Sequence, residues 1–170
     1  MDVHAPTELF VYGTLRHDQP EHARYCRGVT GWREARLRGR LVRIVEGYLL
    51  LVVPPAAVLH RATADAAADE ARRRALDPTA LAHAAQALER AGISWIRGEL
   101  LAFADAGVAW PPLDRWEGAS LDGRGVYARV VVPVWCGHER SAPAAAWVYA
   151  ATQAPAGAVD VAPGSGLEPG

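Results

Sequence analysis

The segment from Leu9 to Arg16 constrains the fold most strongly, because an apolar strand in it runs directly into a glycine turn. Leu9–Tyr12 is short, apolar and rich in β-favouring residues, which predicts a buried strand. Gly13 permits a backbone conformation, or a close approach of a ligand, that a side chain would forbid. Backbone N–H groups in such a turn can face an anion. The segment therefore predicts a strand that ends in a ligand-binding turn.

The composition predicts one soluble globular domain spanning residues 1–170. The chain has 51% hydrophobic residues and a formal net charge of −1, so it can bury a sizeable core and is neither a basic nor an acidic binder. We therefore expect no nucleic-acid partner. All 18 basic residues are arginines, and the absence of Lys excludes a lysine Schiff base and a P-loop. The longest apolar stretch, residues 48–59, is interrupted by Pro54 and Pro55, so no membrane segment is expected.

The cysteine and histidine patterns predict neither a metal site nor a redox site. Cys26 and Cys136 are too far apart for a CxxC or zinc-ribbon pattern, and we expect both to be free thiols in a cytoplasmic protein without a secretory signal. His17 and His22 are five residues apart, and no matching ligand pattern accompanies them. Ser165 lies in a Gly-Ser-Gly sequence without a GxSxG elbow, which gives serine hydrolysis little support.

Strand signals recur along the chain, and helix signals are few. A polar segment, residues 17–27, predicts a short helix or turn that contains His22. Arg33–Val45 alternates partly between arginine and aliphatic residues, as expected of a half-exposed strand punctuated by Gly39. Together these patterns predict an α+β fold. Further strands are expected at Tyr48–Val53, Ser94–Phe103, Tyr127–Trp135 and Ala145–Ala150.

Short motifs in a fixed order resemble those of a known superfamily. They are Tyr12–Leu15, Gly98–Leu100, Leu113–Gly118 (Leu-Asp-Arg-Trp-Glu-Gly), Tyr127–Arg129 and Ala146–Tyr149, with Gly164–Gly166 behind them. The chain resembles the γ-glutamylcyclotransferase-like superfamily, in its γ-glutamylamine cyclotransferase and avirulence-induced-gene-like branch. The resemblance covers roughly residues 8–53 and 95–150. It implies a small mixed β-barrel flanked by short helices.

Residues 54–93 depart from that family, because they are rich in Ala and Arg where members have a shorter, irregular connection. We predict an inserted helical hairpin here, with Asp77 as an N-cap, Pro78 at its first position and Gly92 at its end. The apolar stripe of this helix is Leu81, Ala84, Ala85 and Leu88. The balanced charges of the insertion predict a solvated face, and a lid or a homodimer surface is the alternative. Residues 151–170 are expected to form an irregular tail.

The resemblance implies an enzyme that closes a γ-glutamyl group into 5-oxoproline and expels an amine, without a cofactor. Glu117 occupies the position of the family's catalytic glutamate, as general acid and base. Because an ordinary glutamate is a poor base for an amine, we expect desolvation by Trp110 or Trp116 to raise the pKa of Glu117. The alternatives are a solvent-facing Glu117 and a catalytic Asp114, although the place of Asp114 after two prolines suits helix capping instead.

The resemblance also implies a substrate-binding role for the turn. The main-chain N–H groups of Tyr12, Gly13, Thr14 and Leu15 would hold the α-carboxylate and polarise the γ-carbonyl. Arg16 either pairs with a carboxylate or is solvated. Two more residues have open roles. Arg129 is either an outward charge or part of an ion pair, and Tyr149 is either a pocket wall or barrel core.

Three functions follow from these patterns. The first is a γ-glutamyl cyclotransferase whose partner is a small-molecule γ-glutamyl substrate. The second is a non-enzymatic binding module on the same fold, if the insertion fills the pocket. The third is an amide hydrolase or acyltransferase in which Glu117 activates water or an external amine.

Overall fold

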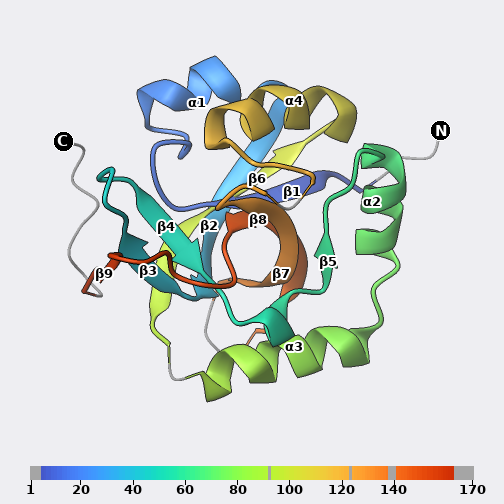
Figure 1. Ribbon diagram of the computed structural model, residues 1–170. Coiled ribbons are helices and arrows are strands. Elements are labelled where there is room, and N and C mark those ends of the chain that lie inside the picture. The colour runs from blue at the N-terminus through green and yellow to red at the C-terminus, as the bar shows by residue number, and fades with distance from the viewer. Residues whose placement is uncertain (1–4, 92, 123, 138–140, 163–170) are drawn as a thin grey trace.

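The computed structural model describes residues 5–91, 93–122, 124–137 and 141–162. A six-stranded sheet forms its centre, with the strand order β2-β6-β1-β8-β7-β5. β2 also pairs with β7, so the hydrogen bonds run through a closed ring of five strands (Figure 1). The strands of this sheet are β1 (Thr7–Val11), β2 (Val29–Arg38), β5 (His60–Arg61), β6 (Trp95–Phe103), β7 (Ala128–Cys136) and β8 (Ala144–Ala150).

In the described part of the chain, a smaller sheet and five helices accompany the ring. The second sheet has the order β4-β3-β9 and consists of β3 (Arg40–Arg43), β4 (Leu49–Val52) and β9 (Val159–Asp160). The helices are α1 (Pro20–Tyr25), the 3-10 turn η1 (Pro55–Ala57), α2 (Ala66–Arg74), α3 (Pro78–Arg90) and α4 (Ala106–Glu117). α1 and α4 lie together on one side of the ring, and α3 lies on the opposite side (Figure 1). The predicted mixed α+β class is confirmed.

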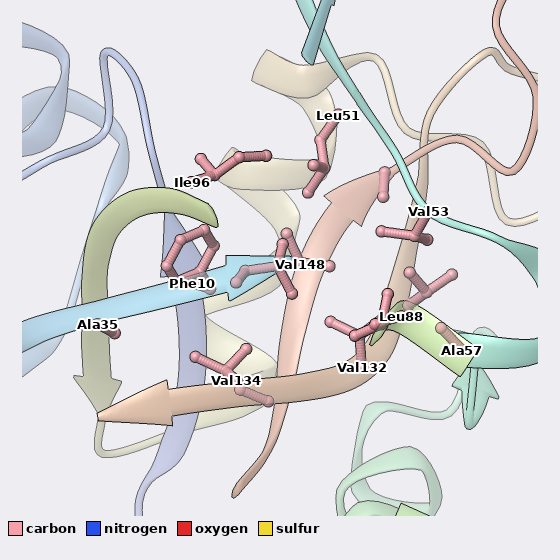
Figure 2. Close-up of a cluster of buried hydrophobic side chains, with 14 of the residues drawn as sticks. Phe10, Ala35, Leu51, Val53, Ala57, Leu88, Ile96, Val132, Val134 and Val148 are labelled. Atoms are coloured by element: carbon pink, nitrogen blue, oxygen red, sulfur yellow. The ribbon is translucent and has the colours of Figure 1, made fainter. Parts of the chain in front are cut away.

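The strand β1 separates two hydrophobic cores because successive side chains on a strand point to opposite faces. Phe10 belongs to a core that also includes Val132, Val134 and Val148 (Figure 2). Leu9 and Val11 face the other way, into a core that β1 shares with α4. The buried strand predicted at Leu9–Tyr12 is therefore confirmed, and the turn that follows it lies at the end of a rigid element.

The single strand predicted at Arg33–Val45 is wrong in its extent. The structure has two strands there, because the chain leaves the ring at Gly39 and enters the second sheet. Val42 then lies in a separate small core with Leu50 and Ala151. The arginine-aliphatic alternation continues across this break, so the pattern alone does not reveal it.

The predicted helices of residues 54–93 are present, but they do not form a hairpin. The Asp77 side chain caps α3 by accepting a hydrogen bond from the Thr79 amide at 2.9 Å, with Pro78 at the first helical position, as predicted. α2 packs against α4, β5 and β8, whereas α3 packs against η1 and β7 (Figure 1). Each helix thus covers its own part of the ring. Gly92, the predicted helix terminator, lies outside the described residues.

The predicted solvated face of the insertion is also wrong for α2, where three charged residues are buried. Glu70 pairs with Arg73 and accepts a hydrogen bond from Trp147 Nε1 at 2.9 Å. Asp69 pairs with His60 at 2.8 Å. Burial of these charges is tolerated because each one has a partner of opposite charge or a hydrogen-bond donor. Glu70 and Arg73 pair within α2, but Trp147 lies on β8 and His60 on β5, so the charge balance of the segment does not predict the burial.

The predicted irregular tail contains one regular element. β9 pairs with β3 through Val42 and Arg43, which fastens residues 159–160 to the second sheet. Gly164–Gly166, the last motif of the resemblance, lies outside the described residues. Among the helices described, none has the length and apolar character that crossing a bilayer requires.

Candidate active site

Glu117 is the last residue of α4, and both ends of this helix have local sequence causes. Asp105 caps the start by accepting a hydrogen bond from the Gly107 amide at 2.8 Å. Gly118 ends the helix in the left-handed conformation with φ 63°, which favours glycine. The helix therefore starts well before Pro111 and Pro112, which lie inside it. The predicted capping role of Asp114 is wrong, because this residue lies near the end of the helix.

The carboxyl group of Glu117 is electrostatically unusual. The side chain is half-buried, and desolvation raises its pKa from 4.5 to about 7. Within the described residues, no hydrogen bond or ion pair reaches this carboxylate to stabilise its charged form. The group can therefore take up and release a proton near neutral pH. This environment differs from that of the solvent-facing glutamate considered as an alternative.

The two tryptophans that the sequence suggested as an apolar wall have contacts of their own. Trp110 packs in the core against Phe103 and Trp147, and Trp116 is 42% exposed and stacks on Tyr25 at 4.2 Å. The charge of Glu117 instead acts on four other groups. It contributes to raising the pKa values of Tyr12, Cys26, Tyr127 and Tyr149.

Burial is the main cause of those four shifts, and it keeps the groups neutral. The pKa values of Cys26 and Tyr127 rise to about 12, and those of Tyr12 and Tyr149 rise well above their ordinary value. The groups on which the charge of Glu117 acts are thus uncharged at neutral pH, and Glu117 titrates several pH units below each of them. Cys26 and Tyr127 were not among the predicted site residues.

Two tyrosine hydroxyls at this site are held by the second sheet. Tyr127 donates a hydrogen bond to the Leu49 carbonyl on β4, and the hydroxyls of Tyr12 and Tyr127 lie 3.4 Å apart. Tyr127 is the first residue of the Tyr-x-Arg motif. The motif could therefore have identified it as a site residue, whereas the strand pattern alone could not. The second sheet therefore orients a wall of the site.

Asp114, Arg129 and Tyr149 form one buried group beside the site. Arg129 Nε donates to Asp114 Oδ1 at 3.0 Å, and the Tyr149 hydroxyl donates to the same oxygen at 2.6 Å. The guanidinium also lies over the rings of Trp110 and Trp147, at 4.3 and 5.0 Å from their centroids. The ion-pair interpretation of Arg129 is confirmed. Tyr149 is buried in the core, and its charge interaction with Glu117 also places it near the site.

The turn after β1 presents backbone donors that the protein does not use. The carbonyl of Leu15 accepts a hydrogen bond from His22 Nδ1 at 2.9 Å, and the Gly13 carbonyl accepts one from the Arg16 amide at 3.2 Å. In the described part of the chain, the amides of Gly13, Thr14 and Leu15 donate no hydrogen bond. Three successive unpaired N–H groups can bind a carboxylate or stabilise an oxyanion. The side chain of Tyr12, at the start of this turn, is one of the groups whose pKa the charge of Glu117 raises.

Arg16 lies on the surface side of the turn. Its guanidinium pairs with Asp18 at 3.3 Å, and both side chains are partly exposed. A substrate carboxylate would have to compete with Asp18 for this arginine.

One cluster in the described residues has metal-ligating side chains close together. The ligand atoms of His17, Asp18 and Glu99 lie within 4.8 Å of one another. However, His17 Nδ1 and Glu99 Oε1 are 2.6 Å apart, which is a hydrogen-bond distance. Tetrahedral zinc with bonds of about 2.0–2.1 Å would separate its ligands by roughly 3.3 Å. The pair therefore fits a shared proton better than a shared ion.

A shallow cavity of about 430 Å³ lies at the end of the β7–β8 ladder. Neither Glu117 nor the turn after β1 lines it. Its lining residues include Arg61, Val126, Ala128, Ala150 and Gln153.

The ring of five strands, with its acidic helix end and adjacent turn, defines a protein of the γ-glutamyl cyclotransferase-like fold. Residues 9–60 match the family model described as "Gamma-glutamyl cyclotransferase, AIG2-like". The chain is also similar to the crystal structure of an AIG2-like protein from Mus musculus, with a TM-score of 0.52 and 19% identity over 89% of this chain and 82% of that chain. Residues 9–60 are therefore similar to the AIG2-like γ-glutamyl cyclotransferase family, and most of the chain shares the fold of the mouse protein.

A second solved structure shares less with this chain. YkqA from Bacillus subtilis has a TM-score of 0.43 and 17% identity, covering 86% of this chain and 36% of that chain. No curated protein sequence gives a significant match.

Proposed function

We propose that this protein is a γ-glutamyl cyclotransferase that converts a γ-glutamyl amide into 5-oxoproline and a free amine. Glu117 acts as the general acid and base, and the reaction requires no cofactor. The observation that carries the proposal is the pKa of about 7 of the Glu117 carboxyl at the end of α4, and the turn after β1 with its three unpaired amides supports it.

The raised pKa matters because the base must take a proton from an α-ammonium group, whose pKa is about 8. An ordinary glutamate with a pKa of about 4.3 would make this transfer unfavourable by about 5 kcal/mol. With the pKa at about 7, the mismatch falls to about one unit, or about 1.4 kcal/mol. Desolvation thus brings the pKa of Glu117 close to that of the substrate ammonium, as general acid-base catalysis requires.

The proposed reaction is a proton transfer followed by an intramolecular displacement. Glu117 removes a proton from the α-ammonium, and the free amine nitrogen attacks the γ-carbonyl carbon. The new C–N bond closes the five-membered ring, and the oxyanion accepts hydrogen bonds from the amides of the turn. Glu117 returns the first proton to the leaving nitrogen, and the bond to that nitrogen breaks. The ring nitrogen still carries two hydrogens after the attack, so Glu117 takes up the second of these protons and passes it to the released amine. The amine thus leaves as an ammonium, and Glu117 is again a carboxylate.

The neutral neighbours of Glu117 suit this cycle. Tyr12 and Tyr127 remain protonated and add no competing charge, and the Asp114 carboxylate is already paired with Arg129. Asp114 is therefore a poorer candidate than Glu117 for the base.

The position of the insertion bears on the binding-module alternative. α2 packs on α4, β5 and β8, and α3 packs on η1 and β7. These contacts are on other parts of the ring than the turn at Gly13–Leu15, which favours an enzyme over an occluded fold.

The test is mass-spectrometric detection of 5-oxoproline after incubation with γ-glutamylamines, γ-glutamyl dipeptides and glutathione. We expect 5-oxoproline from the wild type, and a large loss of it in Glu117→Gln. Glu89→Gln changes an exposed glutamate on α3 and is the matched control. Free glutamate in place of 5-oxoproline would indicate hydrolysis, and no product from any substrate would favour a binding role.

A further inference from the structure

Glu99 is a buried carboxylate that the proposed reaction does not use. It lies in the middle of β6, is 7% exposed, and stands opposite Val11, the last residue of β1. Its neighbour Gly98 allows β1 and β6 to approach closely, since a Cβ there would lie 2.2 Å from the Val11 carbonyl oxygen. The carboxylate thus projects from a point where two strands of the ring are closely packed.

Both oxygens of this carboxylate are bound by a single residue, His17. The backbone N–H of His17 donates to Oε2 at 2.8 Å, and Nδ1 of the imidazole lies 2.6 Å from Oε1. The imidazole also stacks on Trp32, with ring centroids 3.7 Å apart and an interplanar angle of 10°. This stack explains why Trp32 is 48% exposed on β2, because the ring supports His17 instead of joining the core. We call this arrangement of Glu99 and His17 the clamp.

The clamp closes the turn that carries the unpaired amides. The chain leaves the sheet after Val11, opposite Glu99, and returns at His17 to the same Glu99. Residues 12–16 therefore form a short loop whose two ends meet at one residue of β6. Fixing both ends of so short a loop removes most of its conformational freedom.

We propose that Glu99 and His17 are positioning residues that hold the amides of Gly13, Thr14 and Leu15 in place to bind the substrate's α-carboxylate. Glu99 acts through His17 and does not touch the substrate. This inference rests on the proposed function for the identity of the bound group, whereas the clamp itself can be tested without any reaction.

The variants separate loss of the clamp from loss of a carboxylate. Glu99→Ala removes both hydrogen bonds. Glu99→Gln keeps them, because the amide oxygen can accept from the His17 N–H while the amide nitrogen donates to Nδ1 of a neutral imidazole. His17→Ala keeps the backbone bond and loses the ring contacts, so if Glu99→Ala does not fold, a loss of kcat/KM in His17→Ala is the deciding result. Glu8→Ala is the matched control, since Glu8 lies on the adjacent strand β1 and forms a 2.6 Å ion pair with Arg33.

The first readout is amide hydrogen exchange by NMR, which does not depend on activity. We expect the His17 amide to be protected in the wild type and in Glu8→Ala, and to exchange at least about tenfold faster in Glu99→Ala, as for the loss of a hydrogen bond to a charged group. Glu99→Gln should restore protection. An unchanged exchange rate in Glu99→Ala would overturn the inference.

The second readout is the kinetics of 5-oxoproline formation. We expect kcat/KM to fall about tenfold or more in Glu99→Ala and to recover in Glu99→Gln, since the amides bind both the α-carboxylate and the developing oxyanion. Faster exchange with an unchanged kcat/KM would also overturn the positioning role. If the wild type forms no 5-oxoproline but the exchange rates respond as expected, the proposed function fails and the clamp stands.

Discussion

Replacing Glu117 by glutamine is expected to stabilise the protein at alkaline pH. Burial of an ionised carboxyl without a partner costs free energy, and glutamine removes the charge while keeping the shape. In the folded state the pKa of Glu117 is about 7, against an ordinary value of 4.5. The folded protein therefore binds more protons than the unfolded chain between these two values, so this group lowers stability as the pH rises through that window.

The size of the effect follows from the two pKa values. Below pH 4.5 the carboxyl is protonated in both states, and Glu117 carries no penalty. Above pH 7 the penalty is complete, and a shift of about 2.5 units corresponds to about 3 kcal/mol. Between about pH 5 and about pH 8, the stability of Glu117→Gln relative to the wild type should rise by about 2.5 kcal/mol.

Urea unfolding followed by tryptophan fluorescence measures this difference. Groups that titrate equally in both proteins cancel when the variant is compared with the wild type at each pH. Glu89→Gln, on the exposed side of α3, should show no such change. A relative stability of Glu117→Gln that stays constant within about 0.5 kcal/mol over this range would refute the desolvated carboxyl.

Three further predictions concern activity, the buried ion pair and the thiols. The kcat/KM for 5-oxoproline formation should fall as the pH drops through about 7, because Glu117 must be ionised to accept a proton, and Glu117→Gln should lower kcat by about 10²–10⁴-fold at neutral pH. Arg129→Ala should reduce the free energy of unfolding by about 3–5 kcal/mol in urea, because it leaves Asp114 without its partner; a loss below about 1 kcal/mol would contradict this. In a thiol-labelling assay near pH 8, Cys136 should react in the native protein, whereas Cys26 should react only after unfolding, since it is buried and its pKa is about 12. Equal labelling rates for the two thiols would exclude this account of Cys26.

Local sequence signals predicted the elements that depend on local causes. The apolar run at Leu9–Tyr12 became β1, and Asp77 and Pro78 start α3 as their capping preferences require. Gly118 ends α4 immediately after Glu117 because it accepts a positive φ. The motif resemblance also brought Glu117 and the Gly13 turn into one hypothesis, although they are about a hundred residues apart.

Interactions with distant partners explain the errors. Asp114 follows two prolines and so suggested a cap, but Asp105 caps α4, and Asp114 lies in its last turn, where it binds Arg129 and Tyr149. The charges of α2 suggested a solvated face, but Glu70 and Arg73 are satisfied by each other and by groups on β8. Whether a charged residue can be buried depends on the partners that the fold brings to it. The residues next to it in the sequence do not identify these partners.

The sequence by itself therefore determined the fold class, most strands and helices, and the identity of the candidate carboxyl. Only the tertiary structure decided the properties that make this carboxyl useful. The pKa of Glu117 depends on desolvation by the folded protein. The shape of the turn depends on the hydrogen bond that the His17 amide donates to Glu99 and on the one between His22 and the Leu15 carbonyl, which leave the other amides of the turn free. Both are effects of surroundings assembled from separate strands and helices. For that reason, a sequence motif can identify the candidate residues but cannot predict their pKa values or their free hydrogen-bond donors.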